Sequence, residues 1–418
     1  MSDRRYERQQ TQRGSHALKG PLAGLKVIDA STVVAGGFAS VLMADLGAEV
    51  IKVENPAGGD SNRQLTPFKD GASLYHKMNA RNKKSVTLDL RQAKGQSLFK
   101  RMAAKADAVI ENFRAGTMEK WNLGYDVLSA DNPGLVMLRI SGYGQDGPYS
   151  HRPGFGTIAE VMSGLTTRKG FADRHPLLSP IPLADEQTGM FGAYSIMAAI
   201  YRRDHDIGDA AGKGQVIDLA LFEPLFRMIE DQVINYDQTG MVAERMGNRL
   251  LLNAPRGVFE TRDGRWIAIS AFTESTVKRL LNVVGGPALA DDPRFVSPQL
   301  RVTNVDVLED IICAWLKQHT EAEVLEIFDR ADVVGCELYD IKKIMQDPHY
   351  LHRGDIVSVK DPELGDVKVC GVVPKFSDTP GEVAHLGIPL GQSNHEVYCD
   401  WLGVSEQEFE QLKSNGVL

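Results

Sequence analysis

The first 150 residues alternate between short apolar segments and amphipathic segments, and this alternation constrains the fold more than any other feature. The spacing predicts helices over 38–46 and 93–105, and it predicts strands over residues 25–29, 49–53, 85–90, 108–110 and 136–138. Strands and helices that alternate at this pace form βαβ units, which build a mostly parallel sheet. We therefore predict an α/β fold.

A different pattern follows between residues 245 and 335. Two apolar segments, 258–260 and 266–269, flank an Asp263-Gly264 turn and predict a β-hairpin. Two helices are expected next, one after Asn304 and one opened by Thr320 and Glu323 in a capping-box pattern. This block predicts a second, smaller α+β domain. The tail returns to a strand over 367–373 and ends in a helix opened by Ser405 and Glu408.

Composition narrows the classes of function. The net charge is −8, from 47 basic and 55 acidic residues, and the chain has no long basic block, so nucleic acid is not an expected partner. No run of about 18 apolar residues occurs, so no membrane-spanning helix is predicted. The polar N-terminus lacks a secretory signal, which favours a flexible tail over 1–19 and a cytoplasmic protein. A mitochondrial presequence is the alternative, given four arginines in that segment, although Asp3 and Glu7 count against it.

The cysteines and histidines give no metal signature. Cys313, Cys336, Cys370 and Cys399 form no CxxC pair, so we expect buried free thiols in a reducing compartment. His349 and His352 lack a third ligand at metalloenzyme spacing, and we interpret them as structural. We predict no metal site.

The segment Gly142–Gly147 matches GxGxxG after a predicted strand. A dinucleotide site would need a helix to open at once, but Pro148 and the segment 152–156 continue a loop. We therefore interpret this segment as part of an active-site loop. The first turn, residues 33–37, also lacks the fingerprint, yet its backbone N–H groups could face a phosphate or an acyl carbonyl.

Two further segments carry candidate site residues. Asn112, Phe113 and Arg114 end a strand and offer an amide, a ring and a guanidinium, which suit a nucleotide. A strand-end turn with Phe113 in the core is equally compatible. Asp185 precedes a helix of small residues, and its commoner role would be an N-cap. A carboxylate kept ionised at a helix start is also a possible nucleophile, so both roles stay open.

Many motifs, in the same order, resemble those of the class III CoA-transferases, the family of formyl-CoA transferase and carnitine CoA-transferase. The likeness covers about residues 20–418, and it rests on the segments 21–25, 34–36, 44–54, 58–60, 82–86, 111–114, 142–148, 347–349, 353–354, 376–381 and 390–391. It implies a Rossmann-like large domain built from both chain ends, here 20–225 and 340–418. A linker over 226–244 and a small domain over 245–335 complete the chain, and two subunits interlock as rings into a homodimer.

The resemblance also implies site residues. Asp185 matches the family's catalytic aspartate. The CoA-binding positions fall on Val33, Val34, Ala35, Asn55, Leu88, Asn112, Phe113, Lys120 and Tyr143. Asn55 stands where formyl-CoA transferase has a basic residue, and Lys120 replaces its arginine, which keeps the charge but loses the forked geometry.

The implied reaction moves CoA from an acyl-CoA donor, with succinyl-CoA as one candidate, to a free carboxylic acid. Asp185 would form an acyl anhydride and then an aspartyl-CoA thioester, with no permanently bound cofactor. Backbone N–H groups of the first turn or of the Gly142–Gly147 loop would stabilise the oxyanions. The alternatives are an α-methylacyl-CoA racemase and a non-catalytic CoA-binding protein. Phe155 stands where the racemase has a proton-carrying histidine, and the presence of Asp185 argues against simple binding.

The acceptor acid is less constrained. The glycine-rich active-site lid of formyl-CoA transferase has no clear equivalent in the corresponding segment, 247–257. Leu250 and Leu251 also replace the common His-Pro, which weakens formyl-CoA:oxalate transfer. Arg249 or Arg256 could bind the second carboxylate of a dicarboxylic acid such as succinate. A solvated loop arginine is the alternative for both.

Overall fold

The computed structural model describes residues 20–205 and 212–418. Residue contacts divide the chain into two units. The first unit comprises the described residues up to 165 together with 178–234 and 351–418, and the second comprises 166–177 and 235–350. The second unit thus includes residues 166–177, which the sequence analysis assigned to the large domain. The expected tail over 1–19 lies outside the described residues.

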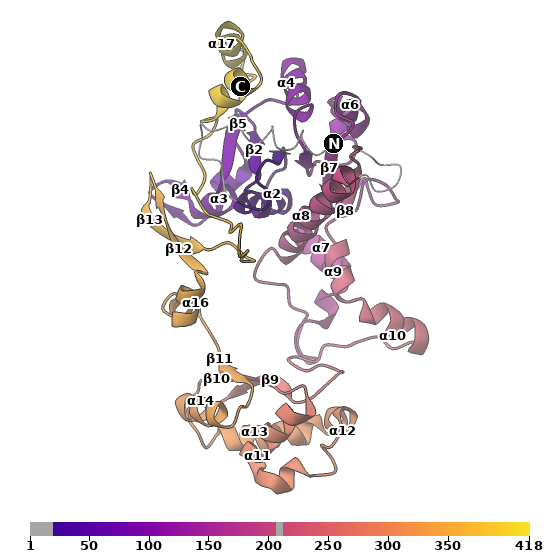
Figure 1. Ribbon diagram of the computed structural model, residues 1–418. Helices are drawn as coiled ribbons and strands as arrows, with labels where there is room; N and C mark the ends of the chain where they lie inside the picture. The colour runs from indigo at the N-terminus through magenta and orange to yellow at the C-terminus, as the bar shows by residue number, and fades with distance from the viewer. Residues whose placement is uncertain (1–19, 206–211) are drawn as a thin grey trace. The chain divides into compact units, whose positions relative to one another are not determined.

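A six-stranded parallel sheet forms the centre of the first unit (Figure 1). Its order is β5-β2-β1-β6-β7-β8, and every neighbouring pair is parallel. The strands are β1 (Lys26–Asp29), β2 (Glu49–Glu54), β5 (Lys83–Thr87), β6 (Ala108–Glu111), β7 (Val136–Ser141) and β8 (Val216–Ala220). In chain order this is 3-2-1-4-5-6, the doubly wound arrangement in which ligands bind where the order reverses, here between β1 and β6. The five predicted strands are confirmed, and β8 was not predicted.

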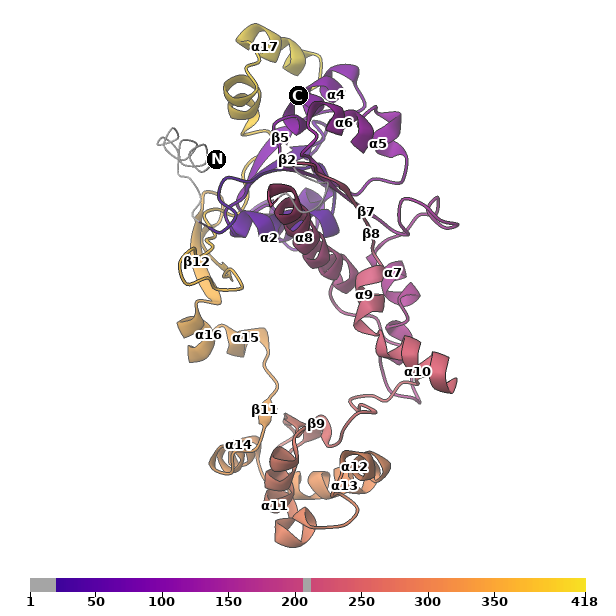
Figure 2. The same cartoon turned by 45° about the vertical axis from the view of Figure 1, so that its right-hand side comes forward.

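Helices cover both faces of this sheet because successive strand residues point to opposite sides. Val27 belongs to one buried cluster and Ile28 to the other. On the Val27 side lie α2 (Ala35–Asp45) and α8 (Leu183–Asp204). On the Ile28 side lie α4 (Ala93–Ala103), α6 (Tyr125–Asp131) and the C-terminal α17 (Glu406–Ser414), as Figure 2 shows.

Shorter elements complete the first unit. Two antiparallel hairpins pair β3 (Phe68–Lys69) with β4 (Ala72–Ser73) and β12 (Ile356–Asp361) with β13 (Gly365–Cys370). The remaining helical segments are η1 (Ser61–Gln64), α3 (Leu74–Asn79), α5 (Thr117–Lys120), α7 (Gly156–Met162), α9 (Glu223–Met228), α16 (Pro348–Arg353) and the π-helix η4 (Glu396–Trp401). Helix α10 (Asp231–Thr239) crosses the boundary between the units.

The second unit is an antiparallel sheet with helices. Its strands are ordered β11 (Gly335–Glu337), β10 (Trp266–Ser270) and β9 (Arg256–Glu260). The predicted hairpin is therefore confirmed. Its other elements are η2 (Thr166–Arg168), α11 (Glu274–Ala290), α12 (Pro298–Thr303), α13 (Val305–Leu316), α14 (Glu321–Arg330) and α15 (Ile341–Ile344). The capping box of Thr320 and Glu323 at the start of α14 is present as predicted.

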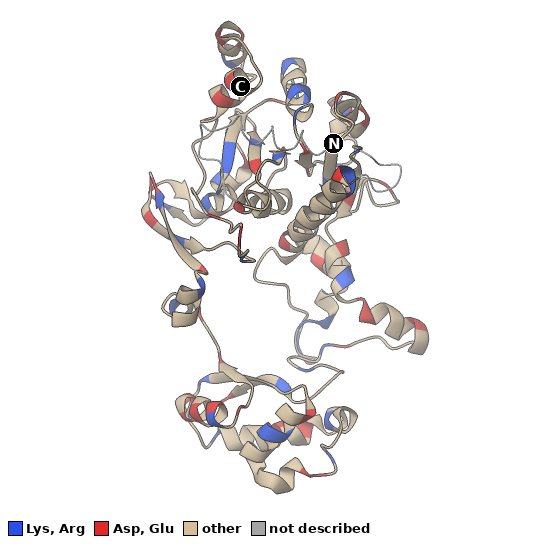
Figure 3. Cartoon of the chain, viewed as in Figure 1, with Lys and Arg blue, Asp and Glu red and all other residues tan. Residues whose placement is uncertain are grey.

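The distribution of charged residues and the apolar character of the helices agree with the composition, but the exposure of the cysteines does not. Acidic and basic residues are interspersed along both units (Figure 3). In the part of the chain that is described, no helix combines the length and apolar character needed to cross a membrane. All four cysteines are free thiols, but the expectation that they are buried is wrong, because Cys336 and Cys370 are exposed and the other two are half-buried. Cys336 and Cys370 lie on strands β11 and β13, each of which has a solvent-facing side.

Candidate active site

The point where the strand order reverses brings two predicted site segments together. The turn after β1 and the residue after β6 are joined by a pair of hydrogen bonds. The Thr32 N–H donates to Asn112 Oδ1 at 2.8 Å, and Asn112 Nδ2 donates to the Thr32 carbonyl at 2.7 Å. Both polar atoms of the Asn112 amide are therefore engaged in holding the first turn.

A cavity of about 300 Å³ opens beside this turn. Its lining includes four of the predicted CoA-binding residues, Val33, Val34, Ala35 and Asn112. It also includes the predicted nucleophile, Asp185. Helix α2 begins at Ala35 with no side-chain cap, and the first N–H groups of a helix lack partners within it. The cavity thus combines a carboxylate with the start of a helix.

Asp185 is the third residue of α8 rather than its N-cap. Pro182 occupies the N-cap position, so the N-cap alternative for Asp185 is wrong. Burial raises the pKa of the Asp185 carboxyl to about 6. A hydrogen bond from the backbone N–H of Asp185 lowers this pKa, and the neighbouring negative charge of Glu186 raises it. The carboxyl is therefore more basic than an exposed aspartate yet mostly ionised at neutral pH.

Gly156 makes room for this carboxyl. A Cβ atom built on Gly156 would lie 1.9 Å from Asp185 Oδ2, closer than any real contact. Glycine at the start of α7 is thus the residue that allows the aspartate side chain to lie against the backbone of that helix. Sequence analysis did not single out Gly156.

A second carboxylate that the sequence analysis missed also lines the cavity. Glu160 is buried, and its Oε1 accepts hydrogen bonds from the Ser179 N–H at 2.9 Å and the Ser179 hydroxyl at 2.8 Å. The sequence could have indicated this position, because Glu160 follows Gly156 by four residues and therefore lies on the same face of the helix. Among the described residues, the cavity lining includes two carboxylates and no lysine or arginine.

The remaining predicted CoA-binding residues do not line this cavity. Asn55 is exposed after β2, where its side chain accepts from the Ala57 N–H. Leu88 is buried after β5 and donates its N–H to the Glu54 carbonyl. Lys120 is exposed at the end of α5. Phe113 is half-buried, packs against the hydrophobic core, and lies edge to face on Trp121 with 5.0 Å between ring centroids. This packing agrees with the alternative in which Phe113 belongs to the core.

The Gly-rich segment forms a loop, as predicted. No helix begins after β7 until Gly156, and Gly142 lines the cavity. Gly142 and Gly154 approach so closely that a Cβ atom on Gly142 would lie 2.8 Å from the Gly154 Cα. The predicted CoA contact Tyr143 packs against Tyr149, with 6.1 Å between ring centroids, and does not line the cavity.

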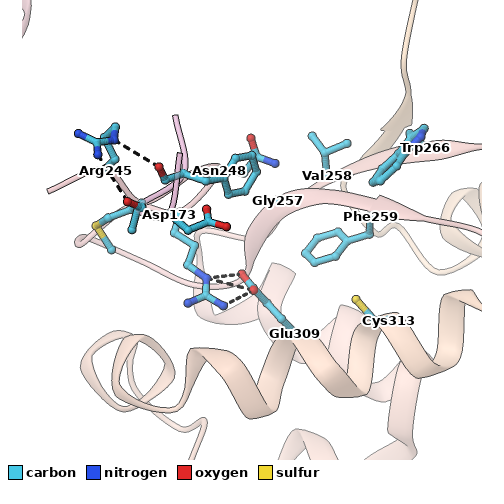
Figure 4. A pocket seen from close by; sticks show the side chains of 13 residues that line it. Asp173, Arg245, Asn248, Gly257, Val258, Phe259, Trp266, Glu309 and Cys313 are labelled. Carbon is cyan, nitrogen blue, oxygen red and sulfur yellow. Dashed lines mark hydrogen bonds and ion pairs between the residues drawn. The ribbon is translucent and has the colours of Figure 1, made fainter. Parts of the chain in front are cut away.

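The two candidate acceptor-binding arginines lie in the second unit. That unit also contains a separate cavity of about 730 Å³ (Figure 4). Arg249 lines that cavity and is bonded to two carboxylates, Glu309 at 3.0 Å and Asp306 at 2.7 Å. Arg256 is exposed and donates from Nη1 to the Asn248 carbonyl at 2.8 Å. Arg249 thus has its charge balanced within its own unit, which leaves Arg256 as the better candidate for an incoming carboxylate.

One group of side chains in the described residues has metal-ligand character. Potential ligand atoms of His395, Cys399 and Glu406 lie within 4.8 Å of one another near the C-terminus. His395 Nε2 already pairs with Glu406 at 2.7 Å, and none of the three lines the Asp185 cavity.

Comparison with known proteins assigns the family. The model of CoA-transferase family III matches residues 22–394. A succinyl-CoA–D-citramalate CoA-transferase of Chloroflexus aurantiacus is 40% identical over 95% of this chain and 98% of its own length. The alpha subunit of a succinyl-CoA–L-malate CoA-transferase from Chloroflexus aurantiacus is 38% identical over 95% of this chain and 92% of its own. A crystal structure of a CAIB/BAIF family protein from Brucella suis superposes with a TM-score of 0.78 at 31% identity, covering 91% of this chain and 99% of that one. The chain therefore belongs to the class III CoA-transferases, CoA-transferase family III, and is an enzyme of that class.

Proposed function

We propose that this enzyme transfers CoA from succinyl-CoA to a dicarboxylic acid of the malate and citramalate type, with Asp185 as the nucleophile. The observation that carries the proposal is the position of the Asp185 carboxyl, which lines one cavity together with the first turn, Val33–Ala35. The two relatives described above use succinyl-CoA and a hydroxylated dicarboxylic acid according to their names. Their high coverage supports a shared substrate class.

The proposed chemistry keeps the energy of the thioester in covalent intermediates. The Asp185 carboxylate attacks the thioester carbonyl, the C–S bond breaks, and an aspartyl succinyl anhydride and CoA thiolate form. The thiolate attacks the aspartyl carbonyl, which releases succinate and leaves an aspartyl-CoA thioester. The acceptor carboxylate then displaces CoA to form a second anhydride. CoA then attacks the acceptor's carbonyl in this second anhydride, which releases the new acyl-CoA and regenerates the Asp185 carboxylate.

The cavity supports parts of this sequence of steps. A raised pKa makes the Asp185 carboxylate a better nucleophile than an exposed one while leaving it ionised at neutral pH. The uncapped N-terminus of α2 offers N–H donors for a developing oxyanion. The carboxyl is half-buried, and bound acyl-CoA would have to exclude the water that hydrolyses an anhydride.

The second carboxylate of the acceptor calls for a positively charged side chain. We assign this role to Arg256, since Arg249 is already paired with Glu309 and Asp306. The remaining CoA contacts are assigned to Asn55, Leu88, Phe113, Lys120 and Tyr143, away from the thioester, with no resident cofactor.

The test is a transfer assay with succinyl-CoA and a panel of free acids, followed by mass spectrometry of the acyl-CoA products. We expect new thioesters with malate or citramalate, and no product from the isosteric variant Asp185→Asn. We expect Arg256→Ala to raise the KM for a dicarboxylate acceptor, while Arg249→Ala serves as the matched control. Tight CoA binding without transfer would contradict the proposal, and deuterium exchange at the α-carbon would then identify a racemase.

We also propose that the enzyme is an interlocked homodimer. Helix α10 buries none of its residues, and Val233, Ile234 and Tyr236 are more than half exposed, which is unusual for large apolar side chains. A partner subunit would cover them. Sedimentation should give twice the mass of 45.9 kDa, and Ile234→Asp should lower the fraction of protein that assembles into the dimer during folding. A monomeric wild-type protein at micromolar concentration would contradict the dimer.

A further inference from the structure

Val33 has a backbone conformation that valine rarely adopts. Its φ is 63°, in the left-handed region, where a β-branched side chain crowds the backbone. The residue lies in the turn between β1 and α2 and lines the Asp185 cavity. Strain of this kind persists only where the surrounding structure fixes the conformation.

Two buried side chains hold Val33, one on each side of the residue. The Val33 N–H donates to Asp60 Oδ1 at 3.3 Å, and Asn62 Nδ2 donates to the Val33 carbonyl. Asp60 and Asn62 are only 5% and 3% exposed. Both side chains come from a single short segment, the helix η1 and its N-cap, so one element holds both polar groups of the strained residue.

This clamp of Asp60 and Asn62 is itself anchored to the sheet. Asp60 Oδ1 also accepts the Asn62 N–H at 2.9 Å, which fixes the two residues relative to each other. The Asp60 N–H donates to Glu54 Oε2 at 2.9 Å, and Lys52 Nζ lies 3.0 Å from Asp60 Oδ2. Glu54 and Lys52 are buried residues of the central strand β2. The clamp therefore links the backbone of Val33 to buried side chains of the sheet.

The neighbouring residues of the turn are held in the same way. The Ser31 N–H and hydroxyl donate to Asp29 Oδ1 at 3.0 and 2.6 Å, and the Ser31 carbonyl accepts from Lys52. Thr32 is bonded at both polar groups by Asn112. Side chains thus bond the N–H and the carbonyl of each residue from Ser31 to Val33, so the conformation of this turn depends on side chains from other elements.

We propose that Asp60 and Asn62 are positioning residues that keep Val33 left-handed and thereby present Val33, Val34 and Ala35 to the acyl-CoA. The inference rests on the proposed role of these three residues in binding CoA. The clamp touches no substrate and acts through the backbone of Val33. Its function is to keep the turn in its binding conformation before the acyl-CoA arrives, so that binding does not have to order it.

The test combines removal of the clamp with removal of the strain. Asn62→Ala should raise the Kd for CoA, measured by calorimetry, by roughly tenfold, because an unclamped valine leaves the left-handed region. Val33→Gly is the reference for the double variant, because glycine adopts this conformation without strain and should lose little further CoA affinity when Asn62 is also replaced. The double variant should regain most of the lost affinity and melt at a higher temperature than Asn62→Ala alone.

Controls separate the clamp from the proposed CoA site. Asn122→Gly places glycine at another left-handed position, φ 56°, in a residue that does not line the cavity, and should not rescue Asn62→Ala. If Asn62→Ala does not fold, the isosteric Asn62→Asp removes the same donor. Unchanged CoA affinity in Asn62→Ala, or no rescue by Val33→Gly, would overturn the clamp. Failure of the wild type itself to bind CoA would instead overturn the proposed function, and the melting temperatures would still report on the strain.

Discussion

At the scale of single residues, Asp185 shows what sequence and structure each contribute. Its identity as the candidate nucleophile came from the resemblance to the family. The comparisons show the family, and the role of Asp185 stays a prediction. Its position as the third residue of α8, against Gly156, is a tertiary feature that no local pattern encodes. The raised pKa of its carboxyl also depends on burial, which the sequence alone does not give.

The raised pKa predicts the pH dependence of the reaction. The carboxylate is the reactive form, so kcat/KM should be constant above the Asp185 pKa of about 6 and fall by about tenfold per pH unit below it. Glu186→Gln is the matched variant: it removes a neighbouring negative charge that raises this pKa, and should shift the inflection to lower pH. A profile that is flat from pH 5 to 8, or an inflection that Glu186→Gln leaves in place, would contradict this assignment.

At the scale of secondary-structure elements, the sequence predicted the strands of the central sheet well and its edge poorly. Strands β1, β6 and β7 lie inside the sheet, and each contains a buried apolar run. Strand β5 lies at one edge, has the mixed sequence KKSVT, and was predicted two residues late. Strand β8 lies at the edge, with exposed Val216 and Asp218, and its pattern is too weak to recognise. The start of α8 was predicted three residues late, because its first turn contains the two acidic residues that suggested a cap.

Close packing of α8 on α2 predicts an asymmetric response to alanine substitution. A Cβ atom at Gly189 would lie 2.8 Å from the Ala35 carbonyl oxygen and 3.0 Å from the Ala39 nitrogen, both backbone atoms of α2. Gly189→Ala should lower the free energy of unfolding by about 1–3 kcal/mol and also reduce kcat, since both helices contribute to the Asp185 cavity. At Gly192 the nearest atom is Leu138 Cδ2, a side-chain atom that can move, so Gly192→Ala should cost less. Equal losses in denaturant titrations of the two variants would contradict this account.

At the scale of the whole molecule, the resemblance to a family carried most of the prediction. Alternation of strands and helices predicted the α/β class, but joining residues 351–418 to the N-terminal part required the family likeness. The inclusion of 166–177 in the second unit was not foreseen, because these residues sit between two segments of the first unit and have no distinctive pattern. The buried network of Asp60, Asn62 and Lys52 was also invisible in the sequence, since its members come from separate positions that only folding brings together.

In the proposed reaction, the Asp185 carboxyl carries first the acyl group and then CoA. The most direct measurement is mass spectrometry of the enzyme after mixing with succinyl-CoA without an acceptor, rapid acid quenching and proteolysis. We expect a CoA adduct on the peptide containing Asp185, which hydroxylamine converts to a hydroxamate and which Asp185→Asn does not form. An adduct at another residue, or transfer activity that persists in Asp185→Asn, would contradict it.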